Sequence, residues 1–106
     1  MNEDDKLQVL CTISLSESQI NRIREVDERI VLDVYRAKEV SKIPDEIWKK
    51  TEVLLSSGAG LPLPEKAPNL RWLQSTYTGV ETILDHPLVQ SEQVVTTSAS
   101  GVMVAQ

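Results

Sequence analysis

Residues 78–81, Thr-Gly-Val-Glu, have the types and spacing of an anion-binding helix start. Thr78 and Glu81 are three residues apart, so the threonine hydroxyl can accept from the amide of Glu81 while the carboxylate turns back to the amide of Thr78. The amides of Gly79 and Val80 are then left at the positive end of the helix dipole. A small carboxylate would fit there. The alternative, that they bind only water as most open helix starts do, stays open.

Neither the single cysteine nor the single histidine has the sequence context of a catalytic residue. One cysteine, Cys11, excludes an internal disulfide framework and a multi-cysteine metal site. A thiol phosphatase needs an arginine six residues after its cysteine, and Glu17 stands there. We therefore predict a buried, structural Cys11 and a surface turn at His86, which precedes a proline. No catalytic residue and no metal site are expected in this chain.

The segment Gly58-Ala59-Gly60 follows a predicted strand and resembles the opening of a dinucleotide-binding loop. The third glycine of that motif would fall at position 63, which is Leu63. Prolines on either side of Leu63 interrupt the helix that would present its amides to a pyrophosphate. We therefore do not assign a dinucleotide site to this segment.

Aliphatic runs alternate with helix signals along the chain. Five runs predict buried strands, at residues 6–12, 29–35, 52–56, 71–75 and 93–97. Ser16 and Gln19 form a capping box that starts a helix, and Pro44 is placed in the first turn of a short second helix. A third helix is expected over residues 79–84. The proline-rich residues 61–68 predict a connector.

Strands that alternate with helices pair in parallel through right-handed connections. We therefore expect an α/β fold: a flavodoxin-like open parallel sheet of about five strands, ordered 2-1-3-4-5, with helices on both faces. Ligands of such sheets bind beyond the carboxyl ends of the strands. Four loops fall there, at residues 12–14, 56–60, 75–79 and 97–101. Three of them are rich in small and hydroxylic residues, as a polar site would be and as exposed loops also are.

Length and charge exclude several classes of protein. A chain of 106 residues forms one domain, and its net charge of -5 makes nucleic-acid binding unexpected. No apolar run reaches the roughly 20 residues that cross a bilayer, and the N-terminus is acidic, so we expect a cytoplasmic protein and no membrane partner. Residues 101–106 end in an apolar stretch without a cap, which we interpret as a truncation.

Four segments, taken in order and spacing, resemble the N-terminal substrate-binding half of the D-isomer-specific 2-hydroxyacid dehydrogenases. They are residues 52–56 (EVLLS), 67–74 (APNLRWLQ), 78–81 (TGVE) and 94–101 (VVTTSASG). The resemblance extends over residues 6–106. One departure is Glu81, because aspartate is usual at this place in the family; the change preserves the capping role.

The resemblance implies an activity and a set of contacts. Enzymes of this family transfer a hydride between NAD or NADP and a 2-oxo or 2-hydroxy acid in a cleft between two α/β domains. It implies that backbone amides at Thr78, Gly79 and Val80 hold the substrate carboxylate, and that Thr78 also lies close to the cofactor. The loop formed by Ser56, Ser57 and Gly58 would line the substrate side.

The family's catalytic arginine, acidic residue and histidine, and its glycine-rich nucleotide motif, belong to later sequence. Residues 101–106 resemble the lead into the helix that crosses to the nucleotide-binding domain. We therefore expect residues 1–106 to be the substrate-binding domain of a larger, homodimeric enzyme, inactive by itself and without tight cofactor binding. The alternative is a receiver-like or partner-binding α/β module without enzymatic activity.

Overall fold

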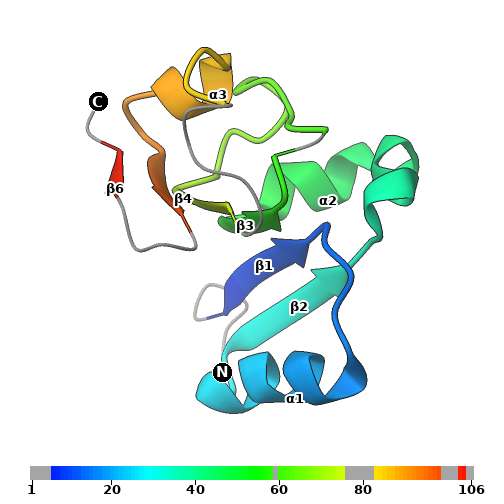
Figure 1. Cartoon of the computed structure of the whole chain (residues 1–106). Coiled ribbons are helices and arrows are strands. Elements are labelled where there is room, and N and C mark those ends of the chain that lie inside the picture. The colour runs from blue at the N-terminus through cyan, green and yellow to red at the C-terminus, as the bar shows by residue number, and fades with distance from the viewer. Residues whose placement is uncertain (1–5, 59, 76–82, 99–102, 105–106) are drawn as a thin grey trace.

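The computed structural model of the chain describes residues 6–58, 60–75, 83–98 and 103–104, which form one sheet with helices on both faces (Figure 1). The strands are β1 (Leu7–Cys11), β2 (Ile30–Val34), β3 (Val53–Ser56), β4 (Trp72–Ser75), β5 (Val95–Ser98) and β6 (Met103–Val104). The helices are α1 (Glu17–Val26), the 3₁₀ helix η2 (Ala37–Lys42), α2 (Asp45–Lys50) and α3 (Pro87–Gln90).

The strand order is β2-β1-β3-β4-β5-β6, and the first five strands in this order pair with one another in parallel. The predicted flavodoxin-like sheet with the order 2-1-3-4-5 is therefore confirmed. The sixth strand was not predicted. Met103 pairs with Thr97 and Val104 with Thr96 in antiparallel register. Their backbone pairs with the otherwise open edge of β5. That residues 101–106 lead into a helix of a second domain stays a prediction.

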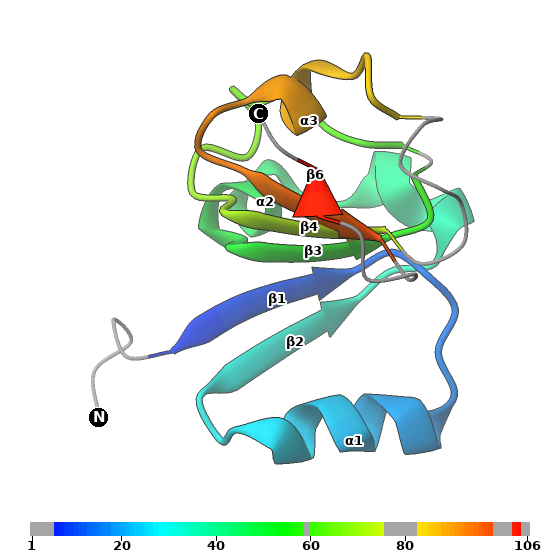
Figure 2. The same cartoon turned by 60° about the vertical axis from the view of Figure 1, so that its left-hand side comes forward.

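Helix α1 begins where the capping box predicted and covers one face of the sheet over β1 and β2 (Figure 2). The Ser16 hydroxyl accepts from the amide of Gln19 at 3.2 Å, and the Gln19 side chain accepts from the amide of Ser16 at 2.9 Å. On the apolar side of α1, Ile20 and Ile23 pack in a cluster with Val9 and other strand residues. This cluster is the apolar contact between α1 and the sheet.

The larger core lies on the opposite face, beneath α2 and α3. Trp48 of α2 is 2% exposed and packs in one cluster with Leu54 of β3, Leu73 of β4 and Leu88 of α3. This cluster therefore packs β3 and β4 against both helices.

Three local predictions need correction. Residues 83–85 form a turn, where the sequence predicted the end of a helix; residues 79–82 lie outside the described part of the chain. Helix α3 was predicted as a plain turn around His86. Its proline, Pro87, occupies the first helical turn, where a missing amide costs little. The fifth strand begins at Val95 rather than at residue 93. The side chain of Gln93 donates hydrogen bonds to the carbonyls of Pro68 and Leu70.

Candidate functional site

The carboxyl ends of three neighbouring strands bring buried hydroxyl side chains to one edge of the sheet. Thr12 follows β1, Ser56 ends β3 and Ser75 ends β4. Ser56 and Ser75 are register partners, and Ser98 of β5 is the next partner along the same row. The first three are at most 3% exposed. The first residues of the predicted loops after β1, β3 and β4 therefore lie side by side, because these strands are neighbours in the sheet.

Thr12 holds the end of β3 through a single acceptor. Its amide donates to the carbonyl of Leu55 at 2.9 Å, and its hydroxyl donates to the same oxygen at 3.3 Å. A carbonyl oxygen has two lone pairs and can accept both bonds. Leu55, the residue before Ser56, is therefore hydrogen bonded to the first residue after β1.

Ser56 is buried at the start of the loop that follows β3. Its hydroxyl accepts a hydrogen bond from the amide of Gly58 at 3.0 Å, which closes a local serine turn. Gly58 has φ 99°, a conformation that side chains other than hydrogen rarely tolerate. Ser57, between them, is half-buried. The sequence implied ligand contacts for all three residues, and the structure places the Ser56 hydroxyl in a bond to the loop itself.

The segment with the predicted carboxylate contacts, including Thr78, Gly79 and Val80, lies outside the described residues, as does the cofactor contact at Thr78. The described residues on either side of this segment are Ser75, which is fully buried at the end of β4, and Ile83, which is 7% exposed and belongs to the larger core. The chain therefore enters and leaves the segment at fixed points.

Cys11 has the environment of a structural residue. It is fully buried, its thiol donates to the carbonyl of Ile13 at 3.4 Å, and burial raises the pKa of the Cys11 thiol against the smaller opposing effect of that bond. A raised pKa reduces the thiolate that a nucleophile requires. Its position agrees with the interpretation drawn from the sequence.

His86 has a role that the sequence did not indicate. It is half-buried and precedes α3, where its Nδ1 accepts from the amide of Leu88 at 3.1 Å. The imidazole therefore caps a short helix, and the surface-turn interpretation was incomplete.

Gly60 lies where the backbone closely approaches a neighbouring side chain. Gly60 has φ 69°, and a Cβ added there would lie 3.0 Å from Cγ1 of Val40. No helix follows in described residues 60–68, so the backbone does not present a row of amides there. These residues do not fit the pyrophosphate of a dinucleotide.

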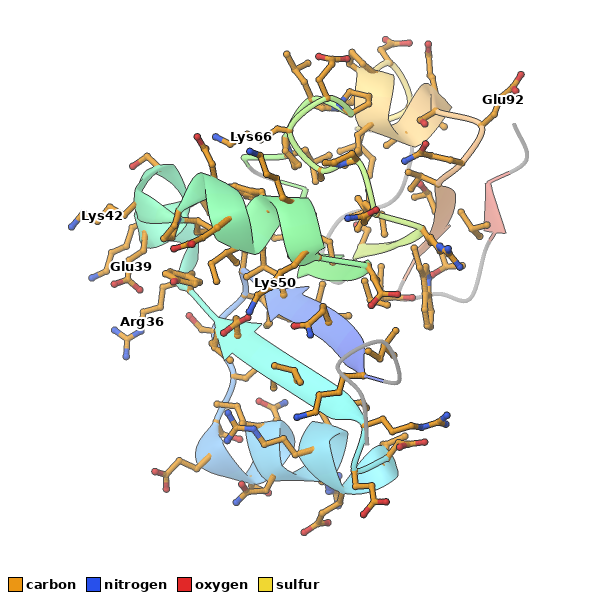
Figure 3. The ribbon with its side chains drawn as sticks, turned by 180° about the vertical axis from the view of Figure 1, so that it is seen from behind. Arg36, Glu39, Lys42, Lys50, Lys66 and Glu92 are labelled. Atoms are coloured by element: carbon orange, nitrogen blue, oxygen red, sulfur yellow. The ribbon has the colours of Figure 1, made fainter. Side chains whose placement is uncertain are left out.

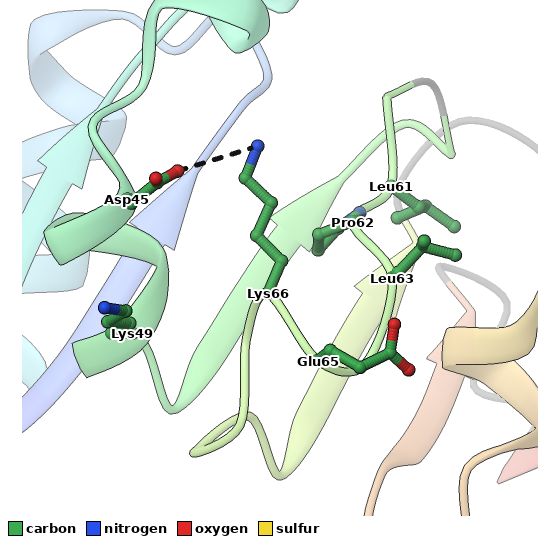
Figure 4. A pocket seen from close by; sticks show the side chains of 7 residues that line it. All are labelled: Asp45, Lys49, Leu61, Pro62, Leu63, Glu65 and Lys66. Atoms are coloured by element: carbon green, nitrogen blue, oxygen red, sulfur yellow. Dashed lines mark ion pairs between the residues drawn. The ribbon is translucent and has the colours of Figure 1, made fainter.

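A groove in the described part of the chain lies elsewhere, between α2 and the connector after β3 (Figure 4). Its volume is about 650 Å³, and its lining residues are Asp45, Lys49, Leu61, Pro62, Leu63, Glu65 and Lys66. The Lys66 ammonium lies 3.9 Å from the Asp45 carboxylate, and both side chains are exposed. A surface ion pair of this kind contributes little. Of the predicted ligand contacts, the described ones, Ser56, Ser57 and Gly58, do not line this groove.

Charged side chains elsewhere extend into solvent, as Figure 3 shows for Arg36, Glu39 and Lys42 around η2. In the described residues, no three His, Cys, Asp or Glu side chains gather to hold a metal ion. None of the helices in this part of the chain has the length and apolar character to span a membrane.

Comparison of the chain with family models, curated proteins and solved structures found no match in any of the three. The assignment of function therefore depends on the residues themselves.

Sequence reasoning missed the supporting roles of Thr12 and Ser56. A signal for one of them was present, because a serine two residues before a glycine at a strand end is typical of a local serine turn. The bond from Thr12 to Leu55 links residues 43 positions apart and depends on the pairing of β1 with β3. A single sequence contains no local signal for it.

Proposed function

We propose that this chain is the substrate-binding domain of an NAD(P)-dependent D-2-hydroxyacid dehydrogenase and holds the carboxylate of a 2-oxo or 2-hydroxy acid. The observation that carries the proposal is the Thr-Gly-Val-Glu pattern at residues 78–81, which follows β4 at the carboxyl edge of a parallel sheet. Free backbone amides of successive loop residues can hold a small anion through hydrogen bonds.

The neighbouring strand ends support this proposal. Ser56 and Ser75 lie in register, so the loop at residues 56–58 starts beside the strand end that leads to residue 78. In open parallel sheets this edge is the usual place for a ligand. A substrate bound by amides at Gly79 and Val80 would then have Ser57 as a polar neighbour.

Nicotinamide chemistry would require residues outside this chain. The cofactor supplies a hydride to the C2 carbon of a 2-oxo acid, and a proton goes to the oxygen. The glycines at 58 and 60 do not fit its pyrophosphate, so no contact to the dinucleotide is assigned to them. On this proposal the domain binds and orients the acid, while a second domain provides the nucleotide and the catalytic side chains.

The test is the binding of pyruvate and of two control ligands to the 106-residue chain. Ligand-observed NMR measures this binding. Methyl pyruvate keeps the 2-oxo group and removes the charge, while acetate keeps the charge and removes the 2-oxo group. Pyruvate is expected to bind more tightly than either control, and mixing with NADH should give no turnover. Equal binding of pyruvate and methyl pyruvate would contradict a site built for a carboxylate.

One observation favours the second candidate, a partner-binding module. Trp72 and Val95 are register partners on adjacent strands and are 44% and 45% exposed. The Trp72 indole N–H donates to Thr97 at 2.8 Å, and the Thr97 hydroxyl is hydrogen bonded to Gln74. The polar groups are thus satisfied within the sheet, and the exposed surface is apolar, although parallel sheets are normally covered on both faces.

The simplest partner for this surface is a second copy of the chain. Sedimentation of the wild-type chain and of Trp72→Lys tests for such self-association. Association of the wild type that is lost in Trp72→Lys would support a docking surface. Two monomeric proteins with unchanged pyruvate binding would instead favour the substrate-binding domain.

A further inference from the structure

We propose that His86 is a pH-sensitive cap of helix α3. Its neutral imidazole holds the start of the helix against the larger core, and a proton on the ring breaks this contact. This role goes beyond the proposed function and does not depend on it. His86 is the only histidine of the chain, and histidine is the side chain that ordinarily changes charge between about pH 5 and 8.

The hydrogen bonds of α3 leave one buried amide that depends on the imidazole. Pro87 has no amide hydrogen. The amides of Val89 and Gln90 donate to the His86 carbonyl at 3.0 and 3.2 Å. The amide of Leu88 donates to Nδ1 of His86 at 3.1 Å, its acceptor within the described residues. Because Leu88 is fully buried, water cannot replace the imidazole as the acceptor.

The bond to Leu88 requires a neutral ring with an unprotonated Nδ1. In neutral imidazole one nitrogen donates and the other accepts, so the proton of the capping form is on Nε2. The imidazolium has two donors and no acceptor. A proton on Nδ1 therefore removes the acceptor and places two N–H groups against each other. The amide of Leu88 is then buried without a partner, which opposes the capped conformation.

The helix that the imidazole caps has little stability of its own. It consists of four residues, far fewer than an isolated helix needs. Its position depends on the burial of Leu88 and Val89, which are at most 1% exposed and pack in the larger core with Trp48. Loss of the cap therefore weakens a segment that contributes two side chains to this core.

No ion pair stabilises the charged ring in the described part of the chain. Strands β4 and β5, which α3 packs against, contain no charged residue. The other neighbouring segments carry exposed charges: Asp85 before the imidazole, Glu92 after α3, Glu65 and Lys66 of the connector, and Asp45 and Lys49 of α2, which line the groove beside it. Protonation in the folded chain thus breaks the cap without forming a described salt bridge.

Stability should therefore rise with pH across the range in which histidine titrates. The unfolded chain has no cap to lose, so it binds the proton more readily than the folded chain, and acid favours the state that binds more protons. The contribution of the cap is present at about pH 7.5 and is lost as the pH falls toward about 5.5. The effect of Asp27 begins only near pH 3.8, so the two responses are separate.

Urea unfolding at about pH 7.5 and about pH 5.5 tests this role in the wild type, His86→Asn and Ser16→Ala. The unfolding equilibrium constant of the wild type should rise about tenfold on acidification. Asparagine can accept from the same amide at both pH values, so His86→Asn should change little. Ser16→Ala removes a cap that does not titrate, and should be less stable at both pH values with the acid response of the wild type.

A second measurement needs only the wild-type chain. Nitrogen-15 NMR of the His86 ring should show the proton on Nε2 and none on Nδ1 at about pH 7.5. On acidification the amide signal of Leu88 should move together with the ring signals, while that of Gln19, bonded to the Ser16 hydroxyl, should not.

Four results would overturn the proposed cap. They are a proton on Nδ1 at neutral pH, a Leu88 amide signal that does not follow the ring, wild-type stability that is equal at both pH values, and an acid response that His86→Asn retains in full.

Discussion

The Cα of Gly60 approaches the side chain of Val40 so closely that a Cβ at position 60 would lie 3.0 Å from Cγ1 of Val40. The contact joins the connector after β3 to the 3₁₀ helix η2. Since the loop at residues 56–58 leads directly to this point, the Gly60–Val40 contact marks where the chain after the candidate site rejoins the fold.

Gly60→Ala is therefore expected to destabilise the protein by about 1–3 kcal/mol, because alanine at φ 69° is strained and its methyl group would press on Val40. Urea unfolding measures the change. In a Val40→Ala background the added penalty of Gly60→Ala should be smaller, since the contact is gone while the backbone strain remains. Equal stability of wild type and Gly60→Ala would show that the close approach does not exist in solution.

The capping box of α1 provides a second prediction. Ser16→Ala removes the acceptor for the Gln19 amide and should cost about 1 kcal/mol of unfolding free energy. Ser18→Ala, an exposed change within the same helix, serves as the control and should have little effect or stabilise slightly. If both substitutions have the same effect, the capping bond makes no net contribution.

The fold was predictable to a large extent because its signals are local. The strand β1 and the Ser16–Gln19 capping box are encoded by neighbouring residues. The missed elements are short or depend on distant pairing: α3 has four residues, and Met103 and Val104 form a strand only because β5 is beside them.

The candidate site divides in the same way. The position of Ser56 and Ser57 at a strand end followed from sequence periodicity and the strand order. The bond from Thr12 to Leu55 required the structure, since it depends on the pairing of β1 with β3. Contacts predicted for residues 78–80 lie outside the described part of the chain and remain predictions.

A third prediction concerns pH. Side-chain and backbone hydrogen bonds with Arg29 lower the pKa of Asp27 from 3.8 to about 2. Because the folded-state pKa is depressed, the ionised carboxylate stabilises the fold above pH 3.8, and this contribution disappears as the pH falls toward about 2. Asp27→Asn should thus be less stable than wild type near neutral pH, with the difference narrowing on acidification.

Unfolding of both proteins across this pH range measures the effect. Glu28→Gln removes the same charge from an exposed neighbouring residue and controls for net charge. A difference between wild type and Asp27→Asn that stays constant down to pH 2 would contradict the role of Arg29.

The buried indole of Trp48 provides a fourth prediction. Its side chain is 2% exposed, and its N–H has no hydrogen-bond partner in the described part of the chain. Trp48→Ala should cost about 3–5 kcal/mol through the cavity it leaves. Trp48→Phe should cost much less, because it keeps an aromatic ring and removes a buried donor without a partner.

Urea unfolding, monitored by circular dichroism, compares these variants. Trp72→Phe, at an exposed tryptophan, is the control. A loss in Trp48→Phe as large as that in Trp48→Ala would show that the indole N–H does have a partner in solution.

The most direct measurement for the proposed function is the set of backbone amide NMR signals that move when pyruvate is added to the isotope-labelled chain. The proposal predicts shifts concentrated at Ser57, Gly58, Gly79 and Val80, with methyl pyruvate producing smaller changes at the same residues. Shifts confined to the groove around Lys49 and Lys66, or none at residues 79 and 80 at saturating pyruvate, would contradict a carboxylate site at the carboxyl edge of the sheet.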